Sequence, residues 1–344
     1  MLSKTGPMTT RIDRLPILDL SRADNPETAE EFRTALREAT IEVGFFYLVG
    51  HGIGPDRMAQ MFDVARRFFA LPREEKQSVA MLDSPAFHGW TRLGGELTQG
   101  KVDWREQIDI GPERPHGQAT EDEPWRVLDG PNSWPASLPE LRYATSTWIE
   151  DLTEVGRRLL RQWALALGQE PDVFDGAFAK DPSPLLKLVR YPAVDNPSPQ
   201  GDQGVGAHKD PGVLTLLLLE EGSTGLQVAH DGGWIEADPV PGAFVVNIGE
   251  MLEIATNGLL TATDHRVLSP AAGTERISIP FFLNPALGER LPVVELPPGL
   301  ADRARGVTQD ERNILHATFG ANMLKARLRA HPDVAARHHP QLVG

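Results

Sequence analysis

The chain of 344 residues contains no cysteine. A protein without cysteine forms no disulfide, has no thiolate nucleophile and offers no sulfur ligand to zinc or to an iron–sulfur cluster. Any metal site in this chain must therefore be built from histidine and carboxylate side chains.

Long apolar runs are also missing. No run approaches the roughly 18 residues of a membrane span, and the first residues lack the apolar core of a secretory signal. The sequence therefore predicts a cytoplasmic protein that makes no membrane contact, with Met8 as an alternative start to Met1.

Basic side chains are in the minority, because 34 Lys and Arg residues stand against 48 Asp and Glu, for a formal net charge of −14. A surface this acidic repels nucleic-acid phosphates, so we expect no nucleic-acid partner. An anionic small molecule would need a local cluster of Arg, Lys or hydroxyl groups inside a pocket. The ordinary composition, 40% apolar and 24% charged, predicts one globular catalytic unit, by default a monomer.

The character of the chain changes after about residue 180. Residues 137–168 repeat apolar side chains on one helical face, which predicts a long scaffold helix, and helical patterning returns over residues 309–330. Between them, short β-like runs broken by Pro, Gly, Asn and Asp indicate an antiparallel sandwich or barrel. The runs span residues 185–191, 213–219, 226–229, 234–237, 244–248, 265–268 and 277–283.

We therefore predict a mainly β fold with flanking helices. Its parts are an N-terminal α/β region (1–136), scaffold helices (137–180), a β core (181–290) and a C-terminal helical segment (291–344).

His208 and Asp210 form a His-x-Asp pair at the entrance to an apolar run. In an extended backbone, residues i and i+2 project to the same face, so one short segment presents an imidazole and a carboxylate together. A second imidazole, His265, begins another predicted strand. Two histidines and one carboxylate leave coordination positions open, as in iron(II) oxygenases and unlike closed structural zinc sites. Imidazole also suits Zn, Ni and Cu, so these ligands alone do not select iron.

Arg276 and Ser278 also lie two residues apart in a predicted strand. A guanidinium beside a hydroxyl can clamp a carboxylate, which is the local basic feature that the acidic surface makes necessary. Tyr191, from a neighbouring predicted strand, can supply another hydroxyl. The sequence thus predicts a carboxylate site built from strands of the same core.

In these motifs the chain resembles the isopenicillin N synthase-like 2-oxoglutarate- and iron(II)-dependent dioxygenases along nearly its whole length. The family's His-x-Asp, distal His and Arg-x-Ser occur here in the family's order. The N-terminal part also resembles the family's leading region. The matching segments there are residues 15–20 (LPILDL), 43–47 (VGFFY), 50–53 (GHGI) and 68–76 (FFALPREEK).

The resemblance implies a double-stranded β-helix, or distorted jelly roll, with Fe(II) held by His208, Asp210 and His265. It implies that 2-oxoglutarate chelates the iron and that its distal carboxylate is held by Arg276, Ser278 and Tyr191. With O2, such an enzyme oxidises an unactivated C–H bond of a small-molecule metabolite, most often by hydroxylation, and releases succinate and CO2. For the substrate pocket we expect a lining of aromatic and polar side chains: Phe87, His88, Trp90, Arg92, Phe282 and Asn284.

Two alternatives remain open from the sequence. Arg-x-Ser also occurs in relatives that do not use 2-oxoglutarate, so the chain could be an iron oxidase of the same fold that performs oxidative cyclisation or desaturation. Succinate release distinguishes these two enzymes. The other alternative is a non-catalytic metal-binding jelly-roll protein. It is disfavoured because a structural site should be coordinatively closed, and the sequence shows no obvious fourth ligand.

Overall fold

The structure is a computed structural model that describes residues 13–193, 203–308 and 313–342. The helices are α1 (Ala29–Glu42), α2 (Pro55–Phe69), α3 (Arg73–Gln77), α4 (Glu140–Ala166), α5 (Glu250–Ala255), α6 (Pro298–Ala301), α7 (Phe319–Ala330) and α8 (Pro332–His338). The first strands are β1 (Ile17–Asp19), β2 (Phe45–Val49), β3 (Gly89–Thr91), β4 (Leu97–Thr98), β5 (Lys101–Val102) and β6 (Glu106–Ile110). The later strands are β7 (Leu185–Tyr191), β8 (Gln203–His208), β9 (Leu214–Leu219), β10 (Leu226–His230), β11 (Gly233–Glu236), β12 (Phe244–Ile248), β13 (His265–Leu268) and β14 (Arg276–Leu283).

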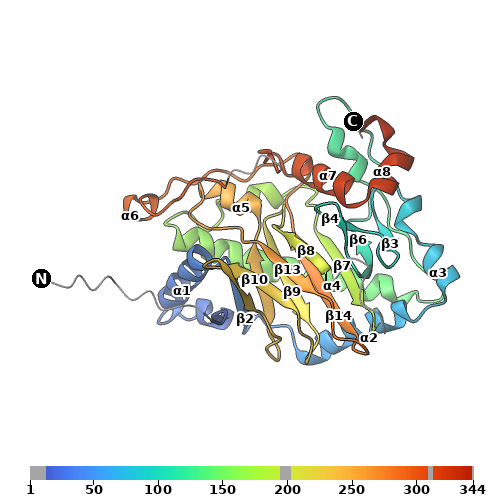
Figure 1. Ribbon diagram of the computed structural model, residues 1–344. Helices are drawn as coiled ribbons and strands as arrows, with labels where there is room; N and C mark the ends of the chain where they lie inside the picture. The colour runs from blue at the N-terminus through green and yellow to red at the C-terminus, as the bar shows by residue number, and fades with distance from the viewer. Residues whose placement is uncertain (1–12, 194–202, 309–312, 343–344) are drawn as a thin grey trace, which may run out of the picture.

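The strands form two main sheets in the centre of the molecule (Figure 1). The larger has the order β1-β2-β12-β9-β14-β7-β6-β3, and the smaller has the order β11-β10-β13-β8. The strands pair antiparallel except for β1 with β2. An inner apolar core joins the sheets, because Val189 and Val245 of the larger sheet cluster with Val228 and Val267 of the smaller. The prediction of a mainly β fold with flanking helices agrees with this arrangement.

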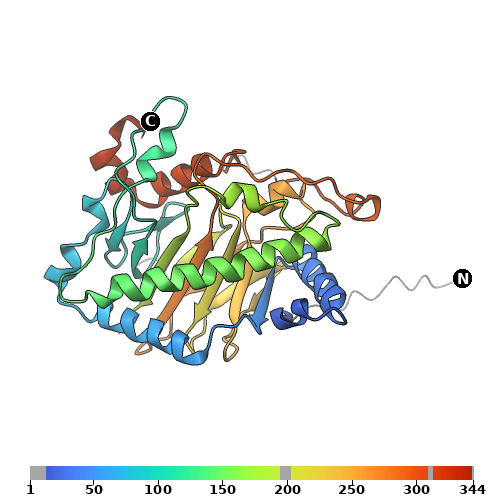
Figure 2. The same ribbon diagram turned by 180° about the vertical axis from the view of Figure 1, so that it is seen from behind.

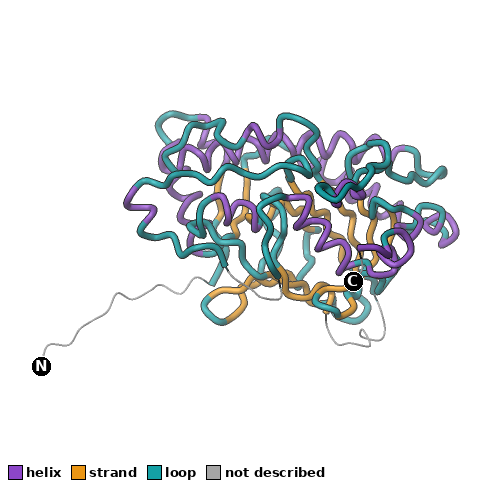
Figure 3. The backbone as a smooth tube through the Cα atoms, turned by 90° about the horizontal axis from the view of Figure 1, so that it is seen from above, coloured by secondary structure: helices purple, strands orange, loops and turns teal. Residues whose placement is uncertain are grey.

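Helix α4 runs across the outer face of the larger sheet (Figure 2). Seen from above, the helices lie mainly on one side of the strands (Figure 3). The apolar stripe of α4, which includes the fully buried Leu152, Leu159 and Trp163, packs in the outer core with residues of the larger sheet. Helix α4 and strand β14 approach each other closely at Gly156, where an added Cβ atom would lie 2.8 Å from the Cδ2 atom of Leu283.

Strand β14 separates the outer core from the interior between the sheets. Ile277, Ile279, Phe281 and Leu283 belong to the outer core that includes α4. Because successive side chains of a strand point to opposite faces, the alternate residues, beginning with Arg276, face the interior. This alternation directs polar groups of β14 toward the site described below.

Two parts of the chain differ from the sequence-based expectations. Of the helix expected over residues 309–330, residues 309–312 lie outside the described part, and α7 begins only at Phe319. The Asn322 side chain holds the preceding turn, because its Oδ1 accepts from the His316 amide at 2.9 Å and its Nδ2 donates to the His316 carbonyl at 2.7 Å. Strand β8 was not predicted, because the glycines at 204 and 206 interrupt any apolar alternation.

No helix in the described ranges combines the length and the apolar character that crossing a membrane requires.

We expect Leu159→Ala to lower the free energy of unfolding by about 2–5 kcal/mol, because it leaves a cavity between α4 and the sheet. Denaturant unfolding measures this change. Tyr143→Ala on the same helix is the matched control, since Tyr143 is 71% exposed and should change stability by less than about 0.5 kcal/mol. Equal effects of the two substitutions would contradict the placement of α4.

Candidate metal centre and active-site cavity

The three predicted metal ligands converge at one end of the smaller sheet. His208 ends β8, His265 begins β13, and the antiparallel register places them directly opposite each other. Asp210 follows β8 by two residues, and its Oδ1 lies 3.7 Å from His208 Nε2 and 3.8 Å from His265 Nε2. One ligand atom from each side chain falls within 4.8 Å of the other two. Within the described residues this is the group of His and carboxylate side chains that fits a metal ion.

Both imidazoles are oriented through their second nitrogen. His208 Nδ1 lies 2.9 Å from the Gly206 carbonyl oxygen, and His265 Nδ1 lies 3.1 Å from that of Thr263. A carbonyl oxygen only accepts, so Nδ1 carries the proton and the lone pair of Nε2 faces Asp210. The pKa of His265 is lowered to about 4, mainly by burial and to a smaller extent by the neighbouring His208. The ring of His265 is therefore neutral near pH 7. A neutral imidazole with a free Nε2 is the form that binds a divalent metal.

Two further side chains fix the Asp210 carboxylate. Thr215 Oγ1 and Asn247 Nδ2 both donate to its Oδ2, the latter at 2.8 Å, which leaves Oδ1 directed at the histidines. Burial would raise the pKa of Asp210, but the two histidines and these hydrogen bonds outweigh it and hold the pKa below its usual value. The carboxylate is therefore ionised. Thr215 and Asn247 were not predicted as site residues, although each is a polar residue in an otherwise apolar strand, which is a signal of an inward role.

A cavity of about 740 Å³ opens beside the metal ligands. His208 and Asp210 line it, together with residues from the β4–β5 hairpin, β7, β14, α5 and α7. Its volume lies in the usual range for small-molecule sites.

The predicted clamp residues lie together on the interior side of the larger sheet. Arg276 stands directly opposite Tyr191 in the pairing of β14 with β7, and its guanidinium carbon lies 4.6 Å from the centre of the Tyr191 ring. Arg276 Nη1 donates to Ser278 Oγ at 3.3 Å. None of the three lines the cavity; Pro280 and Phe282, further along the same face of β14, do.

Arg276 is a buried cation that no carboxylate contacts within the described part of the chain. It is 1% exposed, and its Nε has no hydrogen-bond acceptor in the described ranges. Burial lowers the pKa of Arg276, and the neighbouring Tyr191 and the charge of Glu220 offset that effect only in part. A buried charge is stable only when paired, so this arrangement fits an anionic ligand such as a carboxylate.

The structure separates the expected substrate residues into two groups. Phe282 and Asn284 line the cavity. The four residues from the segment after Asp83, namely Phe87, His88, Trp90 and Arg92, do not.

The reason is the topology, which pairs β3 with β6 as the outermost strand of the larger sheet. Phe87 stacks on His339 at 5.5 Å, and His88 is buried against a separate cavity of about 40 Å³. Trp90 Nε1 donates to Glu106 at 3.0 Å, and Arg92 is exposed.

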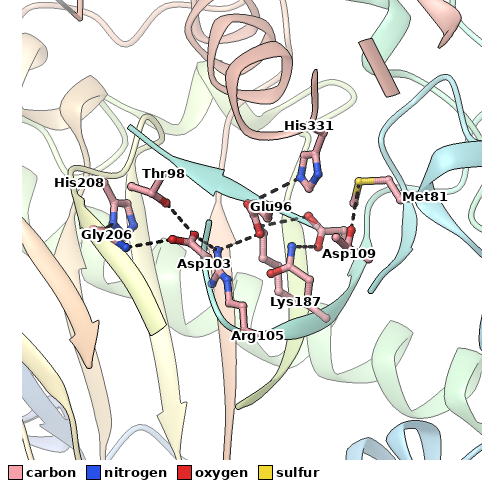
Figure 4. A network of polar contacts seen from close by, with 12 residues as sticks. Met81, Glu96, Thr98, Asp103, Arg105, Asp109, Lys187, Gly206, His208 and His331 are labelled. Atoms are coloured by element: carbon pink, nitrogen blue, oxygen red, sulfur yellow. Dashed lines mark hydrogen bonds and ion pairs between the residues drawn. The ribbon is translucent and has the colours of Figure 1, made fainter. Parts of the chain in front are cut away.

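A buried network of ion pairs forms one wall of the cavity (Figure 4). Glu96 binds Arg105 at 2.9 Å and Lys187 at 3.2 Å, and Asp109 binds Lys187 at 3.4 Å and Arg327 of α7 at 2.6 Å. Burial would raise the pKa of both carboxyl groups, but the neighbouring cations hold both values below the usual range. This network was not predicted, because its partners come from segments far apart in the chain.

The same network reaches the predicted metal ligands through a single residue, Gly206. Asp103 Oδ1 accepts from the Gly206 amide at 3.1 Å, and the Gly206 carbonyl accepts from His208 Nδ1 (Figure 4). Asp103 is fully buried. The orientation of the His208 ring is therefore tied to the cavity wall.

Comparison with known proteins now places the chain in a family. Two family models match it, the non-haem dioxygenase in morphine synthesis N-terminal model over residues 15–137 and the 2OG-Fe(II) oxygenase superfamily model over residues 182–285. The chain belongs to the 2-oxoglutarate- and iron(II)-dependent oxygenases. It is thus an oxidoreductase of small molecules that uses Fe(II), 2-oxoglutarate and O2, as the sequence predicted.

Several relatives of this oxygenase support the assignment. Homoarginine-6-hydroxylase 2-ODD-C23.1 of Arabidopsis thaliana is 38% identical over 80% of this chain and 86% of its own length. A 2-oxoglutarate-dependent dioxygenase of Dothideomycetidae sp. is 37% identical over 96% of this chain and 94% of its own. A full-length Neurospora crassa protein, solved in complex with alpha-KG, superposes with a TM-score of 0.72 at 27% identity, covering 90% of this chain and 95% of that one. The jelly-roll prediction is confirmed by such neighbours.

Two buried histidines of this oxygenase should make its stability fall in weak acid. Burial lowers the pKa of His88 and of His331 to about 4, although His331 Nε2 lies 3.6 Å from Glu96; the desolvation and the charge of Arg327 outweigh that pairing. The unfolded chain binds protons at these rings below about pH 6.5, but the folded chain does so only near pH 4.

The stabilising contribution is therefore complete above about pH 6.5 and is lost as the pH falls toward 4, by up to about 3 kcal/mol for each ring. Denaturant unfolding at several pH values measures it. His331→Gln should flatten part of this dependence, and an unchanged slope in that variant would contradict the assignment.

Proposed function

We propose that His208, Asp210 and His265 bind the catalytic Fe(II) through His208 Nε2, Asp210 Oδ1 and His265 Nε2. The observation that supports this most directly is the convergence of these atoms beside a cavity of small-molecule size. The donor set fits iron, because two imidazoles and one ionised carboxylate suit a divalent metal and leave positions open for other ligands.

The buried guanidinium of Arg276 is proposed to bind the distal carboxylate of 2-oxoglutarate, with Ser278 and Tyr191 as hydroxyl donors. The support is its burial without a contacting carboxylate and its unpaired Nε. A cosubstrate held there by one carboxylate would direct its other end along the inner face of β14. A charge-assisted pair in a dry site would also exclude water from the region.

In this proposal the bound iron supplies the activation of O2 and the protein supplies position. The carbonyl oxygens of Gly206 and Thr263 accept hydrogen bonds from the Nδ1 atoms of the two histidines. Thr215 and Asn247 donate to Oδ2 of Asp210 and so keep its Oδ1 directed toward the metal position. Phe282, which pairs opposite Thr215, forms an apolar part of the adjoining wall. We propose hydroxylation of a C–H bond as the outcome, since several relatives are named hydroxylases, and a cytoplasmic monomer that binds neither nucleic acid nor membrane.

Asp210→Ala should lower the affinity for Fe(II) at least about tenfold and abolish turnover, because it removes the only anionic ligand of the site. Anaerobic Fe(II) titration and succinate release measure the two effects. Asp63→Ala is the matched control, because that carboxylate is exposed on α2, does not line the cavity and is not part of the triad. Full iron binding by Asp210→Ala would sink the proposed triad.

Arg276→Leu should raise the 2-oxoglutarate concentration needed for half-maximal succinate release by about ten- to a hundredfold, since a buried carboxylate loses its charge partner. Arg92→Ala, an exposed arginine outside the cavity, should leave this concentration unchanged. If Arg276→Leu left 2-oxoglutarate dependence intact and weakened substrate binding instead, the oxidase that does not use 2-oxoglutarate would be favoured.

A further inference from the structure

Asn284 carries a buried side-chain amide without a partner. It directly follows β14 and continues the interior-facing alternation of Pro280 and Phe282, with which it lines the cavity. Its exposed fraction is 0%, and neither Oδ1 nor Nδ2 has a hydrogen-bond partner among the residues that the structure describes. Buried polar atoms are nearly always bonded, so a side chain with both ends unpaired needs an explanation.

The other buried asparagines of the described chain show the usual pattern. Asn247 donates to Asp210, and Asn322 both accepts from and donates to the backbone of His316. In both, the amide helps to hold a local structure together. Asn284 makes no such bond, so its amide contributes nothing comparable to the fold.

The neighbours of Asn284 place it on the side of the cavity where the predicted metal ligands lie. Two residues earlier, Phe282 stands opposite Thr215, the residue that bonds Asp210. The Asn284 amide lies against Gly212, where a Cβ atom would be only 2.0 Å from Oδ1. Gly212 also lines the cavity, and the amide occupies the space that a side chain at this position would need.

The charges of the ion-pair wall are balanced internally (Figure 4). Its carboxylates, Glu96 and Asp109, are each bound to two cations, and the buried Asp103 adds a third negative charge against Arg105, Lys187 and Arg327. The nearby His331 is neutral near pH 7. This wall therefore carries no net charge. The rest of the lining includes residues of both signs, and Lys209 there lies 3.6 Å from Glu253.

We propose that Asn284 is a specificity-determining residue that binds a neutral substrate group in which an N–H donor and a carbonyl acceptor lie side by side, as in a carboxamide, a lactam or a ureido group. A primary amide presents one acceptor and two donors in a plane, so it pairs with such an edge through two parallel hydrogen bonds. A site built this way rejects analogues that lack the matching groups, because its own buried atoms then stay unpaired. The inference rests on the proposed function, since it takes the cavity as the substrate site.

The first experiment measures binding to the Fe(II)- and 2-oxoglutarate-loaded protein without O2, by isothermal titration. The probes are uracil and benzamide, each with a matched analogue that lacks N–H donors, 1,3-dimethyluracil and methyl benzoate; L-arginine and benzoate are the charged comparators. We expect uracil or benzamide to bind better than its analogue and better than either ion. Asn284→Leu should weaken that binding at least about tenfold, and Asn284→Asp, which lacks the donor, should do so too.

The second experiment measures thermal stability of the same variants. Asn284→Leu should be as stable as the parent or more so, because it removes two unpaired buried polar atoms, whereas Asn322→Leu should be less stable because it breaks existing bonds. The charge-transfer absorption of bound 2-oxoglutarate with Fe(II) should persist in Asn284→Leu.

Three results would overturn the assignment of Asn284. They are an absence of uracil and benzamide binding by protein that shows the charge-transfer band, equal binding by parent and variants, and a loss of stability in Asn284→Leu as large as that in Asn322→Leu. A missing charge-transfer band in the parent protein would instead count against the proposed function, so the two failures are distinguishable.

Discussion

Strands β8 and β13 pair so that His208 and His265 stand directly opposite each other, and the rest of the centre is arranged around that pairing. A slip of one residue in either strand would turn an imidazole to the opposite face of the sheet. Backbone carbonyls two residues from each histidine then fix the rings, so the same strand backbone sets both the position and the proton of each ligand. Asp210 needs help from the other sheet, through Thr215 and Asn247, because it lies beyond the end of β8.

The interior combines two kinds of buried charge that differ in how they are balanced. The ion pairs around Glu96 and Asp109 neutralise one another, which makes them a rigid part of the scaffold. Arg276 touches no carboxylate of the described chain, and Tyr191 and Glu220 offset the cost of burying it only in part, so an anionic ligand would stabilise it. A chain with a large excess of acidic residues thus buries a cation that none of its described carboxylates contacts.

Sequence reasoning worked best where function depends on neighbours in the chain. His-x-Asp and Arg-x-Ser are local patterns, and strand alternation alone predicts that each pair shares a face. Sequence patterns were less informative where the order of strands in the sheet determines which residues reach the cavity. The segment with Phe87 and Trp90 is aromatic and polar, as a pocket lining would be, but it lies at the outermost strand of the larger sheet. The ion-pair wall joins residues such as Asp109 and Arg327, which are 218 positions apart, so no local pattern could reveal it.

The tight contact of Gly156 with Leu283 ties the two layers of the molecule together mechanically. Leu283 and Asn284 are consecutive and point to opposite sides of the sheet, so a side chain added to α4 would push on one and displace the other. The close spacing of helix and sheet, which the lack of a side chain at Gly156 permits, thereby bears on the position of Asn284 in the cavity lining. A substitution at Gly156, on the outer side of the sheet, would accordingly alter the cavity lining of this chain without touching what the cavity holds.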